Sequence, residues 1–334
     1  MKEKEYRYLV GVQCMTFNQS KYILDALNGF VMQQTNFPFV VMVVDDASTD
    51  GEQEVIKKFV AEQFDINDTA IAEGKETDYA YITYARHKMN KSCYIAALYL
   101  KENHYSRRKS KMPYLVEWRN NIKYEALCEG DDYWTDPLKL QKQVDFLEEN
   151  PEYTLTCHRY DIYDQEEKIW KDDLTECFFK GKKGISFTYQ TQPAWLTKTL
   201  SLVYRLECLE DFFKMSVSRR DIILVYFLLK FGKGYCFNEK MGVYRLNNQG
   251  ICGKQPMYKV KMDSYIAYKS LYQVEKNVIV RKRYYSAYTT VFFLSKGKIL
   301  FKEKFDFRKM VSILYYMWPK VFRLIRRVLC QQAL

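Results

Sequence analysis

An abrupt change from apolar to acidic residues constrains the fold of this chain more than any other feature. The run Ala126–Cys128 is followed at once by Glu129, Asp131 and Asp132, and then by an aromatic pair. This pattern predicts a buried strand that carries carboxylates at its C-terminal end, where open α/β sheets bind their ligands. Carboxylates this close raise one another's pKa unless they share a cation, and their hard oxygens favour Mg²⁺ or Mn²⁺. The alternative is a solvated acidic turn before a capped helix over 138–149.

Strand-like and helical patterns alternate along the first half of the chain. Residues 8–14 and 39–44 are predicted strands, and the second is a β-branched run typical of a strand buried on both faces. Helical spacing follows each strand, near 20–34 and 51–63. With 48% hydrophobic residues the chain can build a large core. We therefore expect an α/β fold, with a Rossmann-like mixed central sheet flanked by helices and a helical C-terminal extension.

The cysteines and the net charge limit the classes of protein to consider. Nine cysteines are scattered singly, without a CxxC pair and with only three histidines, so a structural zinc site is not expected. The chain shows neither an apolar export segment nor an uncharged run that could span a bilayer, which suggests a cytoplasmic protein. A net charge of +11 implies an anionic partner. Nucleic acid is not the expected partner, because RNA-recognition, zinc-finger and helix-turn-helix patterns are missing.

The second predicted strand also ends in acids, Asp45 and Asp46, which a turn-forming run over 47–51 follows. Asp50 or Ser48 could simply cap the next helix. A carboxylate at a strand end can also accept the imide N–H of a pyrimidine base. The chain lacks a GxGxxG or Walker A loop, so neither a dinucleotide-binding nor a P-loop fingerprint is present.

The segment between the two acidic turns has a mixed pattern. A strand is predicted over 79–84 and a helix over 92–100, with a basic turn over 86–91 between them. Residues 104–112 are basic and show no periodicity, so we expect a mobile surface insertion there. Such an insertion could touch anionic lipid or substrate.

Three segments together resemble family 2 glycosyltransferases, which have the A-type nucleotide-sugar fold. They are residues 10–18, residues 43–51 and the run Glu129–Asp132. The longer segment 128–155 is similar to bacterial transferases that build surface polysaccharides. The resemblance covers residues 6–250, and the order and spacing of its short motifs make it specific.

The resemblance implies an activity, a donor and a cofactor. It points to an inverting hexosyltransferase that depends on Mn²⁺ or Mg²⁺. The donor would be a nucleotide sugar, with UDP as the expected nucleotide. The acceptor would be a hydroxyl of a glycan or lipid-linked oligosaccharide in surface polysaccharide biosynthesis.

The resemblance also implies residues of the nucleotide site. Thr16 and Asn18 match the first loop, which lies against the nucleotide. Asp46 matches the residue that contacts the uracil ring, while Asp45 is expected to order the loop. Asn90 matches an asparagine that opens a helix near the nucleotide.

The remaining implied roles concern the metal, the phosphates and the acceptor. Asp131 occupies the family's DxD motif and is expected to bind the metal, with Asp132 in support. Glu129 replaces the usual first Asp and is expected at a ribose hydroxyl. Arg245 matches a segment where an arginine can meet a phosphate, although a structural role is equally open. Asp221 matches the general base for the acceptor hydroxyl, and capping its helix is the alternative.

The resemblance fades after residue 254, which suggests the domain organisation. We expect a glycosyltransferase domain over 1–252, with a nucleotide half over 1–150 and an acceptor half over 151–252, and a helical extension over 253–334. In the extension, apolar residues recur at helical spacing beside a cationic face: Met310, Leu314, Met317, Val321, Leu324 and Val328 against Lys320, Arg323 and Arg327. This helix could pack on the domain, or bind an anionic membrane and hold the protein at the inner face of the cell membrane.

Two other functions remain open from the sequence. A nucleotidyltransferase on a similar sheet would need a Gly- and Lys-rich nucleotide loop, which residues 11–20 lack. A non-catalytic basic module for membrane surfaces or nucleic acid, with a decayed nucleotide site, would not need the carboxylates of Asp131 and Asp221.

Overall fold

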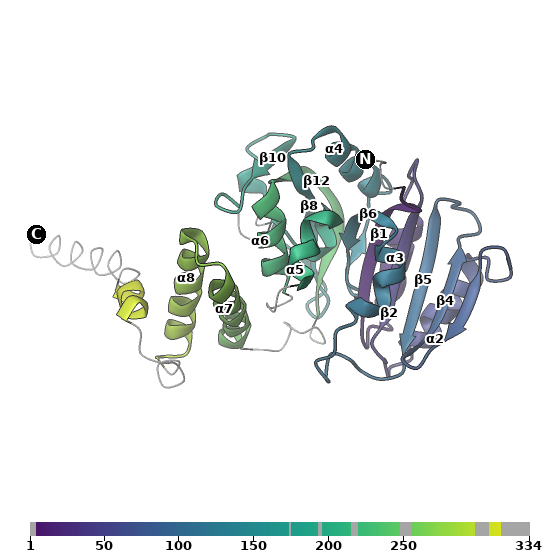
Figure 1. The fold of residues 1–334 in the computed structure, drawn as a ribbon, viewed down its shortest axis with the longest axis horizontal. Coiled ribbons are helices and arrows are strands. Elements are labelled where there is room, and N and C mark those ends of the chain that lie inside the picture. The colour runs from purple at the N-terminus through teal and green to yellow at the C-terminus, as the bar shows by residue number, and fades with distance from the viewer. Residues whose placement is uncertain are drawn as a thin grey trace, which may run out of the picture. The chain divides into compact units, whose positions relative to one another are not determined.

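The computed structural model describes residues 5–173, 175–192, 196–214, 220–247, 256–297 and 307–314. The chain divides into two compact units. The first unit comprises residues 1–213 and 225–247 and contains a sheet. The second comprises residues 214–224 and 248–334, and its described elements are helices (Figure 1).

A mixed sheet of twelve strands forms the first unit. The strands are β1 (Tyr8–Thr16), β2 (Phe39–Asp45), β3 (Glu73–Glu76), β4 (Ala80–Arg86), β5 (Cys93–Leu100), β6 (Ile122–Leu127), β7 (Tyr133–Trp134), β8 (Tyr153–Asp164), β9 (Ile169–Lys171), β10 (Gly184–Phe187), β11 (Val203–Arg205) and β12 (Lys233–Leu246). Their order is β10-β12-β8-β11-β6-β1-β2-β5-β4-β3, with β7 paired to β12 and β9 to β8.

Helices cover this sheet and lie between its strands in sequence. They are α1 (Ile23–Val31), α2 (Glu52–Gln63), α3 (Val116–Arg119), α4 (Lys139–Glu149), α5 (Glu210–Lys214) and α6 (Asp221–Phe231), with short 3₁₀ turns η1 (Met112–Leu115), η2 (Glu176–Phe178), η3 (Thr199–Ser201) and η4 (Leu206–Leu209). The continuous helix α6 begins in the second unit and ends in the first.

The strand β2 illustrates why this sheet forms. All seven of its residues are buried, as its β-branched sequence predicts for a strand covered on both faces. Val41 and Val43 belong to a hydrophobic cluster that includes residues of α1, α2 and α4. Val40 and Met42 point the other way, into a cluster that includes Trp118 of α3. The alternation of side chains along one strand thus builds two layers of core.

Parallel pairing places the predicted site residues along one edge of the sheet. β1 pairs in parallel with β2 and β6, and β2 pairs in parallel with β5. The C-terminal ends of these strands, at Thr16, Asp45, Leu100 and Leu127, therefore share an edge, which we call the carboxyl edge. The acidic turn follows β6, so it lies at this edge beside the loops after β1 and β2.

One predicted helix is wrong. Residues 92–100 were expected to be helical, but Cys93–Leu100 forms strand β5 between β2 and β4. The central Ala-Ala-Leu sequence favours a helix locally, whereas every residue of β5 except Tyr94 is buried. Burial on both faces inside the sheet outweighs the local preference.

The second unit contains a helical hairpin, α7 (Met257–Val274) and α8 (Val278–Leu294), and residues 307–314 are also helical. Tyrosines dominate its core, where Tyr265, Tyr284 and Tyr288 pack together. Within the described residues, no helix is both long and apolar enough to cross a membrane. Most of the predicted C-terminal amphipathic helix falls at 315–334, outside the described residues.

One lysine is buried inside the first unit. Lys139 is 0% exposed, its ammonium lies 4.0 Å from the ring centroid of Trp134, and none of the described atoms accepts a hydrogen bond from it. Burial disfavours the charged form and lowers the pKa of Lys139 from 10.5 to about 7. Between these two pH values the unfolded chain binds more protons at this site than the folded chain. The free energy of unfolding therefore rises with pH across that window.

Replacing Lys139 with methionine is expected to raise the free energy of unfolding at about pH 7 by roughly 3 kcal/mol and to remove this pH dependence. Methionine keeps the apolar stem and a favourable contact with the aromatic ring. Urea unfolding of both proteins at about pH 7 and about pH 10 measures the two effects. Lys142→Met, which removes partly exposed ion pairs with Asp136 and Glu239, is the control and should change stability by less than about 1 kcal/mol. Equal free energies of unfolding for wild type and Lys139→Met at about pH 7 would contradict a lowered pKa for the buried Lys139.

Candidate functional site

A buried carboxylate joins the loops after β1 and β2. Glu52, the first residue of α2, is 0% exposed and accepts hydrogen bonds from the hydroxyls of Thr16 and Ser48, the latter at 2.8 Å. It also accepts the backbone N–H of Gln19 at 2.9 Å. Burial raises the pKa of Glu52, although these donors oppose the rise. The hydroxyl of Thr16, which was predicted to lie against the nucleotide, therefore donates to Glu52 and helps to hold the two loops together.

Asn18, also predicted at the nucleotide, completes this junction from a left-handed backbone conformation with φ 54°. Its side-chain oxygen accepts the N–H of Thr49 at 2.8 Å, and its own N–H donates to the Ser48 hydroxyl at 2.9 Å. In the facing loop Ala47 has φ 60°, a conformation that costs a residue with a side chain about 1 kcal/mol. Phe17, for which no role was predicted, is 43% exposed beside this junction.

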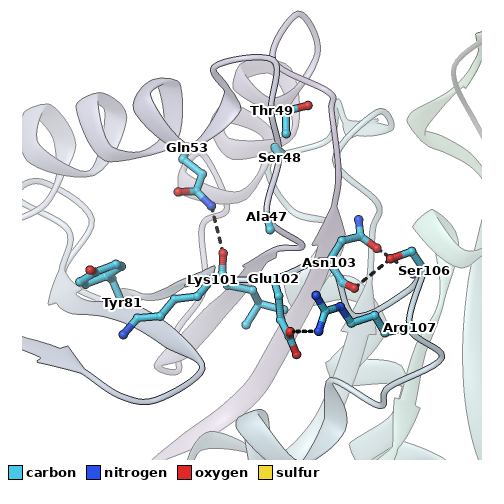
Figure 2. Close-up of a pocket in the computed structure, with 11 residues that line it drawn as sticks. Ala47, Ser48, Thr49, Gln53, Tyr81, Lys101, Glu102, Asn103, Ser106 and Arg107 are labelled. Atoms are coloured by element: carbon cyan, nitrogen blue, oxygen red, sulfur yellow. Dashed lines mark hydrogen bonds and ion pairs between the residues drawn. The ribbon is translucent and has the colours of Figure 1, made fainter.

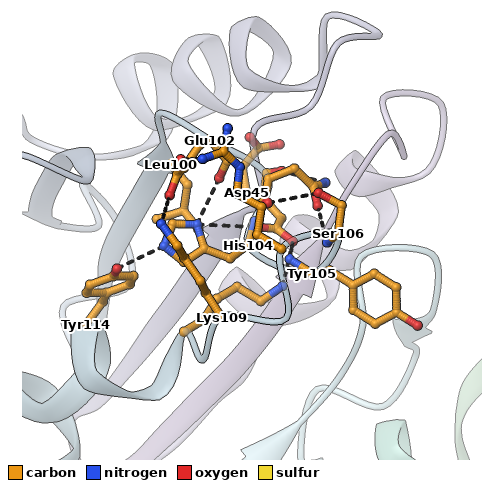
Figure 3. Close-up of polar contacts among 12 residues, drawn as sticks. Asp45, Leu100, Glu102, His104, Tyr105, Ser106, Lys109 and Tyr114 are labelled. Carbon is orange, nitrogen blue, oxygen red and sulfur yellow. Dashed lines mark hydrogen bonds and ion pairs between the residues drawn. The ribbon is translucent and has the colours of Figure 1, made fainter.

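Asp46, predicted to contact a uracil ring, is 1% exposed and anchors the segment that follows β5. Its carboxylate accepts the N–H groups of His104 at 2.7 Å and Tyr105 at 3.0 Å, and the ammonium of Lys111 at 2.8 Å. Figure 3 shows the His104 ring directed toward the Tyr114 hydroxyl, at 2.8 Å. The basic segment predicted as a mobile surface insertion is therefore tied at three points to the carboxyl edge.

These contacts limit what Asp46 can bind. A carboxylate offers about four acceptor positions, and three of those on Asp46 are filled. A base can reach Asp46 only at the remaining position or after segment 103–111 moves. The neighbouring Asp45 accepts the Ser48 N–H at 3.0 Å and the Gln53 side-chain amide at 2.6 Å, which is the loop-ordering role expected for it.

A pocket of about 670 Å³ opens beside these loops, near the end of β5 and the start of β4 (Figure 2). Hydroxyl and amide groups of Ser48, Gln53 and Asn103 line it together with the ring of Tyr81, which is 50% exposed. Arg107, held by an ion pair to Glu102 at 2.5 Å, closes one side (Figure 2). The size and the mixture of aromatic and hydrogen-bonding groups suit a nucleoside.

Gly130 lets the acidic turn after β6 pack directly against the loop after β1. A Cβ atom added to Gly130 would overlap the Thr16 hydroxyl and lie 2.6 Å from Gln19 Oε1, so glycine is required by this close approach. The Gly130 N–H also donates to the Met15 carbonyl at 3.3 Å. This packing places the predicted metal-binding acids beside the predicted nucleotide loops.

Each carboxylate of the acidic turn has a specific hydrogen-bond donor from the second half of the chain. Glu129 Oε2 accepts the Thr199 hydroxyl at 2.6 Å, Asp131 Oδ2 accepts the Asn247 amide at 2.8 Å, and Asp132 Oδ1 accepts the Arg245 N–H at 2.8 Å. Thr199 begins η3, Arg245 lies near the end of β12, and Asn247 directly follows that strand. Residues from η3 and from the C-terminal end of β12 therefore help to hold the acids that follow β6.

Burial and mutual repulsion make these acids suited to a cation. Burial raises the pKa of Asp131. The pKa of Asp132 lies well above its ordinary value because burial adds to the charges of Asp131 and Glu129. In the described part of the chain, no three His, Cys, Asp or Glu side chains form a complete metal cage. A Mg²⁺-like ion needs only one or two carboxylates together with substrate phosphates and water, so Asp131 and Asp132 fit it.

Arg245, predicted as a phosphate ligand, is 7% exposed and supports the acidic turn. Its guanidinium donates to the Asp131 carbonyl at 3.0 Å and pairs with Asp25 of α1 at 2.6 Å. The same group lies 4.8 Å from the ring centroid of Tyr22 and 5.0 Å from that of Tyr133. These contacts favour the structural alternative, in which Arg245 positions the acids.

Asn90 is not brought to the carboxyl edge. It precedes β5, so it lies at the opposite end of that strand, and its amide donates to the carbonyls of Val31 and Gln33 at 2.9 and 2.8 Å. Asn103, just beyond the C-terminal end of β5, lines the pocket and donates to the Asp46 carbonyl at 3.1 Å. Asn103, for which the sequence analysis predicted no role, is thus the asparagine that lies at the carboxyl edge.

Asp221 is exposed and begins α6 in the second unit. Its carboxylate accepts the N–H of the adjacent Ile222 at 2.8 Å. The carbonyl of Arg220 accepts the first helical N–H groups, so Arg220 rather than Asp221 stands at the N-cap position. A capping carboxylate would instead bond to an N–H two or three residues further on. The geometry therefore weakens the alternative in which Asp221 only caps its helix.

Comparison with known proteins identifies related sequences. Residues 14–87 match the model of glycosyl transferase family 2. Uncharacterised proteins of Mycobacterium tuberculosis and Mycobacterium bovis are 30% identical to this chain over 250 residues, which is 72% of its length. The chain spans 60% of the length of these curated relatives.

Two solved structures share the fold. A mannosyltransferase from Pyrobaculum calidifontis, in complex with GDP-Man and Mn²⁺, superposes with a TM-score of 0.52 at 12% identity, over 99% of this chain and 85% of that one. Residues 1–349 of TarS from S. aureus, in complex with UDP-GlcNAc, give a TM-score of 0.50 at 13% identity, over 86% of this chain and 81% of that one. Identities this low show the fold alone. The predicted fold class, an A-type glycosyltransferase sheet with a helical C-terminal region, is confirmed.

Proposed function

We propose that this chain, which carries a glycosyltransferase domain of the A-type fold, transfers a sugar from a nucleotide donor to a hydroxyl group with inversion at the anomeric carbon. One observation carries the proposal. Asp131, which is partly exposed, and Asp132, which is buried, follow β6 and meet, through Gly130, the joined loops after β1 and β2. Open α/β sheets bind ligands at this edge, and such acids suit a cation shared with phosphates.

The proposed donor site has a metal end and a base end. At the metal end, Asp131 and Asp132 hold Mn²⁺ or Mg²⁺, and Glu129 meets a ribose hydroxyl. The bound ion supplies positive charge that stabilises the departing nucleoside diphosphate. At the base end, Thr16 and Asn18 hold the loops in place.

The pocket beside segment 103–111 takes the nucleoside in this proposal. Asp46 orders that segment and meets the base, and Asn103 takes the place predicted for Asn90. Both neighbouring structures contain nucleotide sugars, but one holds a uridine and the other a guanosine nucleotide. The choice of UDP therefore rests on the match of Asp46 to a uracil contact.

The acceptor hydroxyl has to lose a proton as it attacks the anomeric carbon. A carboxylate on the face opposite the departing diphosphate can take that proton, and we assign this role to Asp221. We place this chemistry in a catalytic domain over 1–252 and treat 253–334 as its helical extension. The acceptor in this proposal is a glycan or lipid-linked oligosaccharide of surface polysaccharide biosynthesis, at the cytoplasmic face of the membrane.

Calorimetric titration with UDP, GDP and CMP, each with and without Mn²⁺, tests the donor site. We expect UDP to bind only when Mn²⁺ is present. If GDP bound but UDP and CMP did not, the proposed transferase activity would stand, and the donor would be a GDP-sugar. Absence of nucleotide binding under every metal condition would overturn the donor site and leave the non-catalytic basic module as the better function.

A further inference from the structure

The described part of the second unit carries most of the net charge of the chain. Residues 256–297 and 307–314 contain ten lysines and arginines against two acids, Asp263 and Glu275, which gives +8 of the total of +11. Asp263 is already paired with Arg220 at 3.0 Å. Six of the basic side chains are exposed: Lys259, Lys276, Arg281, Lys282, Lys296 and Arg308. Such a surface attracts anions at long range.

An apolar stripe is exposed on the helix over 307–314. Its residues follow one another at helical spacing, and each is at least 40% exposed: Phe307 (65%), Met310 (40%), Val311 (46%) and Leu314 (57%). Steps of three, one and three place all four side chains on one face of the helix. Met310 and Leu314 belong to the amphipathic pattern that the sequence predicts.

The opposite side of this helix is fixed on α8, beside which it lies (Figure 1). The Ser312 hydroxyl meets the Thr289 hydroxyl at 2.7 Å and donates to the Tyr285 carbonyl at 3.2 Å. Ile313 joins the core cluster of α7 and α8. The ammonium of Lys309 lies 4.8 Å from the ring centroid of Tyr288, with the residue only 6% exposed. These contacts hold one side of the helix against α8, so the apolar stripe on the opposite side faces solvent.

We propose that this stripe and the basic residues around it dock the protein on an anionic lipid surface. The apolar side chains would enter the boundary between head groups and acyl chains, while lysines and arginines meet the anionic head groups. Nucleic acid would account for the charge but not for the exposed apolar stripe. A second copy of the chain would cover the stripe, but it would bring together two segments that each carry a net charge of +8, against electrostatic repulsion.

Vesicle flotation with the full chain tests this surface. One set of vesicles is phosphatidylcholine alone and the other contains one part phosphatidylglycerol to two parts phosphatidylcholine. We expect binding to the anionic vesicles that weakens as salt is raised. Phe307→Ser combined with Leu314→Ser should reduce that binding at least roughly 10-fold, because two large side chains can no longer be buried in lipid.

Matched variants in the first unit separate this surface from general charge and hydrophobicity. Met89 is 85% exposed in the first unit, so Met89→Ser is the control for removing exposed apolar side chains. Arg281→Glu with Lys282→Glu reverses two basic charges on α8 of the second unit. Its control is Lys57→Glu with Lys58→Glu, which reverses two basic charges on α2 of the first unit. Only the variants of the second unit should lose vesicle binding. Equal binding of all variants, or equal binding to both vesicles, would overturn the proposal.

Two other partners for the stripe and its basic residues, a second copy of the chain and nucleic acid, would give different results. Suppose that wild type forms oligomers and does not bind vesicles, and that Phe307→Ser with Leu314→Ser abolishes the oligomers. The stripe would then be a contact between copies of the chain. Oligonucleotide binding that exceeds vesicle binding would assign the charge to nucleic acid. The lipid proposal does not depend on the donor site, so the UDP titration should be the same in wild type and in these variants.

Discussion

An Asp131→Asn variant is expected to lose metal-dependent UDP binding and to transfer sugar about 1,000-fold more slowly than wild type, or slower. Asparagine has the size of aspartate and its carbonyl can still accept the Asn247 amide, but it lacks the negative charge that holds a divalent cation. Calorimetry with UDP and Mn²⁺ measures the first effect. Release of UDP from the donor, with a membrane lipid extract or water as acceptor, measures the second.

Stability and a matched control distinguish this loss from misfolding. The variant removes one of two neighbouring acids whose pKa values are raised, so it should be at least as stable as wild type. Asp145→Asn on α4, where the exposed carboxylate accepts a hydrogen bond from the Gln141 side chain, should leave nucleotide binding and sugar transfer unchanged. Retention of Mn²⁺-dependent UDP binding in Asp131→Asn would place the metal elsewhere.

The sequence predicted the parts of the fold that local pattern determines. The run 39–44 is β-branched and lies in a strand buried on both faces, so its composition and its environment agree. The acids after 126–128 were placed correctly for the same reason, since a buried strand that ends in carboxylates carries them to its own end. Gly130 adds a constraint that the sequence does not reveal, because its close neighbours Thr16 and Gln19 lie far away in the chain.

The errors arise where long-range packing decides the outcome. Residues 92–100 contain good helix formers, and only their position between β2 and β4 makes them a strand. Asn90, predicted to open that helix near the nucleotide, precedes β5 and so lies at the end of the strand opposite to the carboxyl edge.

The hydrogen-bond partners of the Asp46 carboxylate could not be predicted from the sequence either. The carboxylate is held by Lys111 and by two backbone N–H groups from a segment without periodicity. Backbone donors leave no mark in the amino-acid sequence. A site residue can therefore be named from its motif while its hydrogen-bond partners remain hidden.

An Asp221→Asn variant is expected to bind UDP and Mn²⁺ as wild type does and to transfer sugar roughly 100- to 10,000-fold more slowly. The two results belong together, because a general base acts on the acceptor hydroxyl and not on the donor. Asparagine keeps an oxygen for the N–H of Ile222, so the start of α6 should be preserved. The measurements are UDP calorimetry, UDP release from the donor, and the urea midpoint, which should stay close to that of wild type.

Two matched variants show which acid takes the proton. Asp263→Asn, in the same unit and paired with Arg220, removes a carboxylate without a proposed catalytic role and should keep the full rate. Asp211→Asn tests the reserve candidate for the general base, an aspartate ten residues before Asp221 in the sequence. A normal rate in Asp221→Asn with a slow one in Asp211→Asn would move the base to residue 211. Normal rates in both would mean that neither acid takes the proton from the acceptor, and the inverting mechanism would have to draw its base from elsewhere in the protein.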